Sequence, residues 1–296
     1  MSLEIKNLSK QYANGVKALN NLSLTIPTGM FGLLGPNGAG KSSLMRSIAT
    51  LQSPDTGSIQ WGEIDVLNQP EEFRKVLGYL PQEFGVYQRA TAQDLLDHMA
   101  ILKGIADKKE RKKTVKTLLH RVNLYEVRKK AVAGFSGGMR QRFGIAQALL
   151  GNPQVVIVDE PTAGLDPGER NRFYNLLSEI GENVAVILST HIVQDVQQLC
   201  QNMAIINRGE LLYEGKPGSA LASMEGKIWE KQIEKDQVNE YSKRHSVISS
   251  RLAMGKPIIH VHSELDPGEG FRPVEADLED VFFSTIFLAD HVEVTH

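Results

Sequence analysis

Cysteine is almost absent from this sequence, and so are long apolar runs. Cys200 is the only cysteine among 296 residues, which excludes an intrachain disulfide and a zinc site built from several cysteines. Residues 1–6 lack the apolar core of a secretory signal, and no run reaches the ~18 to 20 apolar residues that a membrane-spanning helix needs. We therefore expect a protein of a reducing compartment, by default the cytosol. Any work at a membrane would require another chain that spans it.

The chain also carries little net charge. It has 33 Lys and Arg against 35 Asp and Glu, a net charge of -2 with a pI near 6.5. This balance gives no overall attraction to nucleic acid or to anionic membrane, so such a partner would need a local patch. A hydrophobic fraction of 41% and a charged fraction of 23% are ordinary for a globular protein. The length suffices for one large domain or two smaller ones.

A glycine-rich segment is the strongest motif that the sequence does contain. Residues 35–42 read Gly-Pro-Asn-Gly-Ala-Gly-Lys-Ser, the pattern Gly-x4-Gly-Lys-[Ser/Thr] of a phosphate-binding loop. A buried-strand run at 30–34 precedes it and helical spacing at 42–51 follows it, as the motif requires. Glycines let backbone N–H groups face phosphates, Lys41 can reach the β- and γ-phosphates, and Ser42 can bind Mg2+. We predict a nucleoside triphosphate site that comprises Gly35, Pro36, Asn37, Gly38, Ala39, Gly40, Lys41, Ser42 and Ser43.

Strand and helix patterns alternate along the rest of the chain. Residues 1 to about 30 alternate as short strands broken by turns, whereas residues 84–150 have the spacing of helices with one buried face. The runs 155–158 and 184–188 are apolar and β-branched, as in parallel strands covered on both faces. The pattern predicts an α/β fold with a small β layer and a helical subdomain.

The composition changes after about residue 215. A mixed-charge stretch is followed by a strand pattern at 257–262 and an amphipathic helix pattern near 276–288. We therefore divide the chain into a main domain, 1–215, and a small α+β C-terminal accessory domain, 216–296.

Two acidic residues follow the apolar run 155–158. Asp159 and Glu160 lie at the carboxyl end of a predicted buried strand, where open α/β sheets bind ligands. In a protein with a phosphate loop, the first acid can support Mg2+ and the second can polarise an attacking water. Without that loop, solvation of the strand end or capping of the next helix would be the better interpretation.

A second glycine-rich turn precedes a helical run. Residues 134–141 read Gly-Phe-Ser-Gly-Gly-Met-Arg-Gln, so Ser136 is well placed as an N-cap and the glycines expose backbone donors. Alone this would be an ordinary helix entry. Because a helix N-terminus contributes only ~0.3 to 1 kcal/mol to a surface charge, it makes functional sense as one half of a composite anion site.

Taken together, these motifs resemble the nucleotide-binding subunit of ATP-binding cassette (ABC) transporters. The resemblance covers about residues 1–215 and rests on motifs that occur in the family's order. They are the phosphate loop, Leu80-Pro81-Gln82, Phe135-Ser136-Gly137-Gly138-Met139, Asp159-Glu160-Pro161-Thr162, Gly164-Leu165-Asp166 and Ser189-Thr190-His191. Phe135 and Met139 depart from the common signature Leu-Ser-Gly-Gly-Gln, which leaves its serine and both glycines in place. The resemblance implies a P-loop NTPase core with an N-terminal antiparallel β layer.

The family's roles can be carried over residue by residue. The resemblance implies ATP as ligand, with Mg2+ supported by Ser42, Gln82 and Asp159. It implies that Glu160 is the general base of ATP hydrolysis and that His191 contacts the γ-phosphate and orients the water. Gln82 would sense the γ-phosphate and signal to a membrane partner.

Three further roles come from the same resemblance. Ser136, Gly137 and Gly138 of one subunit would complete the phosphate site of a second subunit, in a head-to-tail dimer and most simply a homodimer. Asp166 would couple the two sites, although Asp166-Pro167 also suits the start of a helix. Tyr12 would stack on adenine, with packing in the β layer as its alternative.

The expected function is an ATPase subunit on the cytoplasmic side of the membrane that powers transport through a separate permease. The alternatives are a soluble ABC ATPase that acts on ribosomes or nucleic acid, and a regulatory switch that hydrolyses little ATP. Residues 274–282 resemble the tail of drug- and lipid-export ABC subunits, or are plain packing. The basic run 108–113 is best explained as a solvated helix face.

Overall fold

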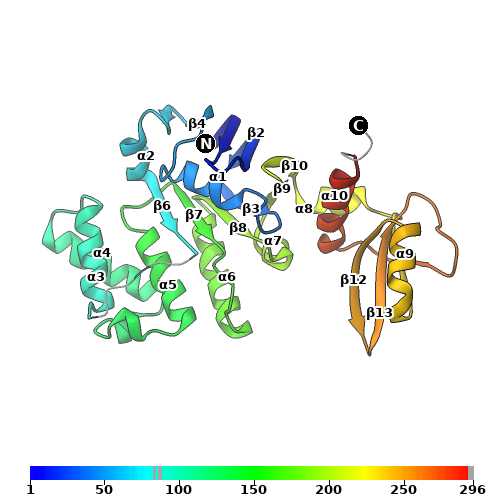
Figure 1. The fold of residues 1–296 in the computed structure, drawn as a ribbon. Helices are drawn as coiled ribbons and strands as arrows, with labels where there is room; N and C mark the ends of the chain where they lie inside the picture. The colour runs from blue at the N-terminus through cyan, green and yellow to red at the C-terminus, as the bar shows by residue number, and fades with distance from the viewer. Residues whose placement is uncertain (83–84, 86–88, 293–296) are drawn as a thin grey trace.

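A central sheet carries the phosphate loop at the carboxyl end of an inner strand. The protein is described by a computed structural model that covers residues 1–82, 85 and 89–292. The sheet has six strands in the order β10-β9-β3-β8-β7-β6 (Figure 1). All neighbours pair in parallel except β10 with β9. The strands are β3 (Gly29–Leu34), β6 (Leu77–Leu80), β7 (Val155–Asp159), β8 (Ala185–Thr190), β9 (Asn202–Asn207) and β10 (Glu210–Gly215).

Alternate residues of the central sheet face two different cores. Val155 and Ile157 of β7 pack in a cluster with helix α1 (Lys41–Ile48). Val156 and Val158 pack in the other cluster, with α6 (Pro167–Gly181) and α7 (Val193–Leu199). Because both faces are covered, every residue of β7 is buried, which explains why its sequence shows no polar alternation.

The predicted N-terminal β layer is present and larger than expected. Its four strands are antiparallel, in the order β2-β1-β4-β5. Alternating side chains such as Leu3, Ile5 and Leu24 are buried against α1. The layer gains two strands from a segment that the sequence analysis did not assign. The elements are β1 (Ser2–Gln11), β2 (Lys17–Pro27), β4 (Thr56–Trp61) and β5 (Ile64–Asp65), with helix α2 (Pro70–Val76) after them.

The helical subdomain follows β6. Thr91 caps its first helix, since the Thr91 side chain accepts a hydrogen bond from the Asp94 N–H at 3.1 Å. The predicted start of the subdomain, Phe84, lies outside the described residues. Its helices are α3 (Ala92–Leu102), α4 (Lys108–Arg121) and α5 (Gly137–Ala148), with short 3-10 turns at Tyr125–Val127 and Val132–Gly134.

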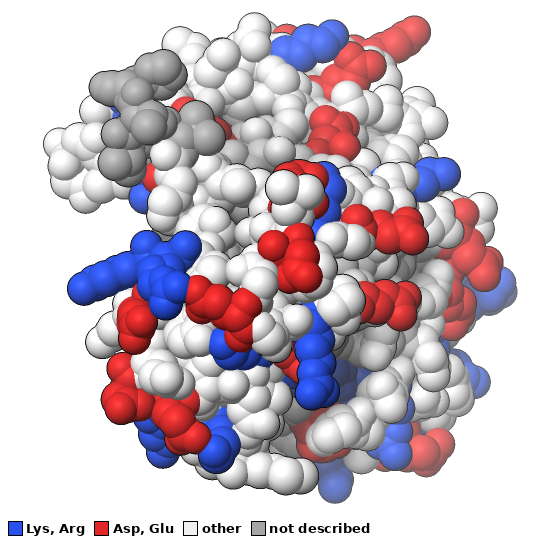
Figure 2. Space-filling view, turned by 90° about the vertical axis from the view of Figure 1, so that its right-hand side faces the viewer, with Lys and Arg blue, Asp and Glu red and all other residues white. Residues whose placement is uncertain are grey.

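The C-terminal residues form a third sheet and a returning helix. The sheet is antiparallel in the order β12-β13-β11-β14 and, with α9, lies apart from the central sheet in Figure 1. Figure 2 shows acidic and basic side chains intermingled over this side of the molecule. The elements are α8 (Pro217–Ser223), β11 (Ile228–Gln232), a 3-10 turn (Lys235–Gln237), α9 (Val238–Arg244), β12 (Val247–Ala253), β13 (Lys256–His262), β14 (Arg272–Pro273) and α10 (Leu278–Val292).

Helix α10 packs back onto the main domain. Leu278, Val281 and Phe282 are buried in the same cluster as Val196 and Leu199 of α7. The Gln194 side chain of α7 donates to the Glu279 carboxylate at 3.1 Å. The predicted division of the chain after residue 215 therefore stays a proposal, because the last helix contributes to the core of the first part.

Candidate nucleotide-binding site

The phosphate loop lies between β3 and α1, as predicted. Gly40, which precedes the first residue of α1, has φ 105°, a left-handed conformation that favours glycine. A side chain at this position would also collide with the carbonyl oxygen of Ala18. On the outer side of the loop, Gly38 has φ 83° and open space around it. The glycines are thus required by the backbone, and they leave the N-terminus of α1 accessible.

The Lys41 side chain folds back onto the phosphate loop. Its side chain is buried, and its Nζ donates to the carbonyl oxygens of Gly35 at 2.5 Å and Pro36 at 3.2 Å. Burial lowers the pKa of Lys41, while the charges of Glu160 and Asp159 act in the opposite direction. Neutral carbonyls compensate this buried cation only partly, so phosphate oxygens would be better partners for it.

The two acids at the end of β7 are both buried. Asp159 pairs in register with Ser189 of β8, and burial raises the pKa of its carboxyl group. Glu160 has φ 49°, an uncommon conformation for a residue with a side chain, and its N–H donates to the Ser189 carbonyl at 2.8 Å. Strained residues of this kind cluster at active sites. The Glu160 carboxylate lies 3.8 Å from Lys41 Nζ.

His191 completes a contact between three elements. Its Nδ1 lies 2.5 Å from Glu160 Oε2, and about half of its side chain is exposed. Lys41 from α1, Glu160 after β7 and His191 after β8 therefore meet at one edge of the sheet, with Glu160 between the two cations or potential cations. Gln82 lies two residues beyond β6, is exposed, and follows a strand whose carboxyl end faces the same edge.

Comparison with known proteins identifies this arrangement. The family described as ABC transporter matches residues 19–163. The ABC transporter ATP-binding protein NatA of Bacillus subtilis is 38% identical over 203 residues, which are 68% of this chain and 82% of NatA. The daunorubicin/doxorubicin resistance ATP-binding protein DrrA of Streptomyces peucetius is 30% identical over 268 residues, 90% of this chain and 78% of DrrA. The chain belongs to the ABC transporter family.

Solved structures agree with this assignment. A dimeric ATP-binding cassette in a post-hydrolysis state, bound to ADP and Pi, superposes with a TM-score of 0.66 at 27% identity, covering 72% of this chain and 98% of that one. This confirms the predicted P-loop NTPase fold. The chain is the ATP-binding subunit of an ABC transporter, and it binds and hydrolyses ATP. The relatives give no support to the alternative of a soluble ABC ATPase on ribosomes or nucleic acid.

Tyr12 of this ABC subunit lies beside α1. Its hydroxyl is 2.9 Å from Ser43 Oγ and donates to Gln52 Oε1 at 3.0 Å, while 37% of the residue is exposed. A tyrosine with this exposure does not belong to the core of the β layer. Stacking on adenine stays a prediction, and the accessible ring permits it.

The signature segment is exposed at Ser136 and Gly137, whereas Gly138 is buried beside Glu169. Ser136 caps α5, since its Oγ accepts from the Met139 N–H at 3.3 Å, as predicted. Ser136 and Gly137 are exposed, and a Cβ on Gly137 would meet no atom within 4 Å. Asp166 is likewise exposed and caps α6, accepting from the Glu169 N–H at 2.9 Å, which confirms the predicted helix start. All three residues are accessible to a second subunit.

A buried group near the site was missed by the sequence analysis. Asp195 of α7 is fully buried and accepts hydrogen bonds from the hydroxyls of Thr162, Thr190 and Tyr174. The signal was present, because Asp195 lies four residues before the buried Leu199 and hence on the apolar face of α7. A carboxylate on a buried helix face needs hydrogen-bond donors from neighbouring elements.

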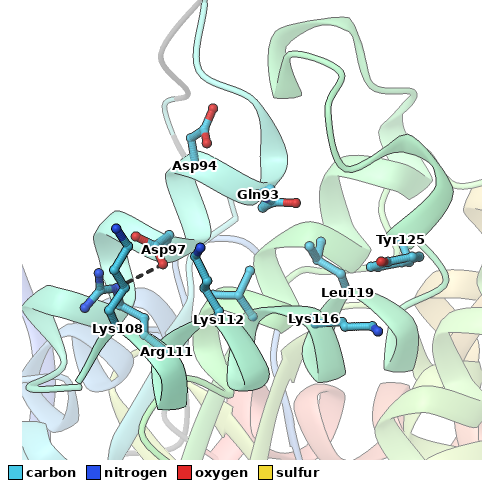
Figure 3. A pocket seen from close by; sticks show the side chains of 10 residues that line it. Gln93, Asp94, Asp97, Lys108, Arg111, Lys112, Lys116, Leu119 and Tyr125 are labelled. Carbon is cyan, nitrogen blue, oxygen red and sulfur yellow. Dashed lines mark hydrogen bonds and ion pairs between the residues drawn. The ribbon is translucent and has the colours of Figure 1, made fainter. Parts of the chain in front are cut away.

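The basic run 108–113 needs one correction. Most of its cations are exposed, as predicted, but Arg111 is buried and its Nε lies 2.9 Å from Asp97 Oδ1. Its guanidinium also donates to the Ala106 carbonyl at 3.0 Å, so it ties α4 to the end of α3. Arg111 and Asp97 help to line a cavity of about 340 Å³ between α3 and α4, shown in Figure 3. No residue of the phosphate loop lines this cavity.

Among the described residues, no helix combines the length and the apolar character needed to cross a bilayer.

Proposed function

We propose that this chain is the ATPase that drives transport through a separate membrane permease, and that it works as a head-to-tail dimer with ATP and Mg2+ held between the subunits. One observation carries the catalytic part: the buried Glu160 carboxylate touches both Lys41 and His191, which come from two other elements. The three side chains meet at the same edge of the sheet, which supports their proposed roles as base, phosphate ligand and water-orienting group.

ATP binding is assigned to the loop and the start of α1. Backbone N–H groups of Asn37, Gly38 and Gly40 face the β-phosphate, and Lys41 exchanges its carbonyl partners for β- and γ-phosphate oxygens. Tyr12 supports the adenine ring. The exchange moves a partly dehydrated ammonium from neutral oxygens to charged ones, which favours the bound state.

The residues present fit a magnesium ion. Ser42 is exposed at the first turn of α1 and offers a hydroxyl, while Asp159 offers a buried carboxylate whose raised pKa a neighbouring cation would lower. Gln82 offers an amide oxygen from the end of β6. Oxygen ligands of this kind suit Mg2+, which would neutralise charge on the transferred phosphoryl group.

Glu160 acts as the general base in this proposal. It accepts a proton from the attacking water, and His191, in contact with Glu160 Oε2, orients the carboxylate and the water toward the γ-phosphate. The hydrogen bond between the Glu160 N–H and the Ser189 carbonyl fixes the backbone from which the base projects. Catalysis then comes from positioning and charge neutralisation.

The second half of each site comes from the other subunit. The exposed Ser136 and Gly137 at the N-terminus of α5 contact the γ-phosphate held by the partner's loop, with the buried Gly138 behind them, and Asp166 couples the two sites. ATP thereby stabilises the dimer, and hydrolysis weakens it. The dimeric form of the ATP-binding cassette that this chain resembles supports the arrangement.

The similarity to DrrA supports an exporter of the drug-resistance type. An alignment of 268 residues must extend past residue 215, so it includes part of the C-terminal region. Within that region, residues 274–277 lead into α10 and residues 278–282 begin this helix, which packs on α7. We place the subunit at the cytoplasmic face of the membrane, attached to the permease.

The test is the variant Glu160→Gln, which keeps the shape of the side chain and removes the base. We expect ATP binding to persist and turnover to fall by ~10²- to 10⁴-fold, the usual contribution of a general base. A dimer should accumulate with ATP and Mg2+, as measured by light scattering after size-exclusion chromatography. Near-normal turnover would remove Glu160 from this role.

Two further readouts complete that experiment. The exposed Glu182, at the end of α6, gives the control Glu182→Gln, which should retain normal turnover and no ATP-trapped dimer. The tagged Glu160→Gln chain, purified from solubilised membranes with ATP, should bring a multi-spanning protein with it. A trapped dimer that never retains such a protein would contradict the transport part alone.

A further inference from the structure

Asp195 is a buried carboxylate for which the proposed mechanism has no use. It is 0% exposed and belongs to α7, the helix that follows His191. Its Oδ2 accepts hydrogen bonds from Thr162 Oγ1 at 2.5 Å and Thr190 Oγ1 at 3.0 Å, and its Oδ1 accepts one from the Tyr174 hydroxyl. Burying a carboxylate is unfavourable unless its oxygens accept hydrogen bonds, and here three hydroxyl groups supply them. A buried charge that needs three dedicated partners suggests a specific role for Asp195.

The three donors come from separate parts of the fold. Tyr174 belongs to α6, Thr162 to the loop after β7, and Thr190 to the end of β8. All three are neutral, and burial together with the hydrogen bond to Asp195 raises the pKa of Tyr174, which keeps that hydroxyl protonated as a donor. One carboxylate therefore fastens α7 to both loops that carry the proposed catalytic residues.

The contacts flank His191 closely. Thr190 Oγ1 donates to Asp195 and accepts the Ile192 N–H at 2.9 Å, so the residues on both sides of His191 are held by one hydroxyl. Rotation of that hydroxyl would release the turn from which the imidazole projects.

The same carboxylate also acts on the side of Glu160. Thr162 follows Glu160 by two residues and is fully buried, with its hydroxyl directed at Asp195. The Glu160 backbone is separately bonded to Ser189 of β8. His191 Nδ1 lies 2.5 Å from Glu160 Oε2. Thr190 precedes His191 in the sequence and Thr162 follows Glu160 by two residues, so Asp195 holds the chain next to both partners of this contact.

We propose that Asp195 is a positioning residue for ATP hydrolysis, which holds Thr190 and Thr162 so that His191 and Glu160 stay in contact. Because Asp195 is fully buried, it would act through these neighbours rather than by direct contact with nucleotide. The inference rests on the proposed roles of His191 and Glu160. A carboxylate that only stabilised the fold would change the stability of the protein without a specific effect on turnover through His191.

The sharpest test changes the hydroxyl of Thr190. Thr190→Val has nearly the same shape but neither donates to Asp195 nor accepts from Ile192, whereas Thr190→Ser keeps both interactions. We expect kcat to fall by ~10- to 100-fold in Thr190→Val, since a displacement of about 1 Å at a catalytic group can cost about 10²-fold. KM for ATP should stay within about threefold, because the phosphate loop is unchanged, and Thr190→Ser should recover most of kcat.

Asp195→Asn tests the carboxylate itself, because its amide presents a donor where a hydroxyl needs an acceptor. It should lower kcat to a similar extent. Its matched control is Asp280→Asn, which alters another buried, hydrogen-bonded carboxylate, at the start of α10. That variant should lower the melting temperature of the protein. At a temperature where it is still folded, its kcat should be unchanged. If Asp195→Asn does not fold, the Thr190 pair decides.

A double-mutant cycle with His191→Ala separates positioning from general stability. If Asp195 acts through His191, then Thr190→Val or Asp195→Asn added to His191→Ala should lower kcat by less than about threefold further. Equal losses in both backgrounds, an unchanged kcat, or a change in KM alone would each overturn the inference. His191→Ala with full activity would instead refute the proposed role of His191, before Asp195 is considered.

Discussion

Tyr12 offers two different groups beside the phosphate loop, and they can be separated. Its hydroxyl is bonded to Ser43 and Gln52, which anchors the side chain to α1, while the partly exposed ring is available for stacking. A tyrosine tied down in this way would present its ring to adenine with little loss of rotamer freedom on binding.

We predict different results for the two substitutions of Tyr12. Tyr12→Ala should weaken ATP binding by roughly 5- to 150-fold, since stacking of a base on an aromatic ring is worth about 1 to 3 kcal/mol. Tyr12→Phe keeps the ring and should stay close to the native affinity. Calorimetric titration with ATP measures both. Equal weakening by the two variants would assign the effect to the hydroxyl, and no weakening by either would remove Tyr12 from the site.

Helix α10 is tied to the C-terminal sheet through one buried pair. Asp280 and Asp277 exchange hydrogen bonds between carboxylates and backbone N–H groups at the start of the helix. Asp280 Oδ1 also lies 2.7 Å from Nδ1 of His260, which belongs to β13 and whose Nε2 is 3.3 Å from Glu230 of β11. The hydrogen bond to Asp280 raises the pKa of His260 above 6.5, burial and Arg251 oppose this, and Glu230 adds to it.

This pair should make the C-terminal region less stable as pH rises. A histidine whose pKa is raised in the folded state contributes stability that is complete below about pH 6.5 and is lost as pH rises through the raised pKa. His260→Gln should abolish that dependence, whereas His98→Gln, at an exposed position of α3, should keep it. Denaturant unfolding followed by Trp229 of β11, in a Trp61→Phe background, measures it. A native protein with constant stability over this range would contradict the prediction.

The elements differ in how far the sequence determined them. Strands β7 and β8 were predictable because burial on both faces leaves uninterrupted β-branched runs. Strand β6 has four residues, Leu77–Leu80, too few to show a period, and β11 mixes charges because most of its residues are only partly buried. The strand order follows from pairings between distant segments, which local patterns do not encode.

The site shows the same division. The phosphate loop and the cap of α5 depend on neighbouring residues, and both could be read from the sequence. The contact between Glu160 and His191 joins the ends of two strands and was not predicted, and the role of His191 came only from the resemblance to a family. The role of Asp195 was not predicted, because it depends on three hydroxyl donors from other elements. These donors come together only when α6, α7, β8 and the loop after β7 pack in the folded protein.

In the proposed arrangement, the whole ABC subunit carries two separate parts of a nucleotide site. Lys41 is bonded within its own loop, near Glu160, and the exposed Ser136 is bonded within its own helix. If one chain formed a complete site, damage to both parts in different molecules could not be repaired by mixing them. In a head-to-tail dimer, each site uses the loop of one subunit and the α5 N-terminus of the other, so mixing can restore one intact site.

We therefore predict complementation between two inactive variants, Lys41→Ala and Ser136→Asp. Aspartate still caps α5 but places a negative charge against the γ-phosphate, and Ser136→Asn, a neutral cap, is the matched control that should retain more activity. Each variant alone should lack turnover. Random pairing of equal amounts makes half of the dimers mixed, each with one intact site of two, so the mixture should reach up to about a quarter of native activity.

A mixture that exchanges subunits, as shown by crosslinking, and yet stays inactive would refute the head-to-tail arrangement. Activity that rises with the product of the two variant concentrations would show that the repaired site is shared between two chains.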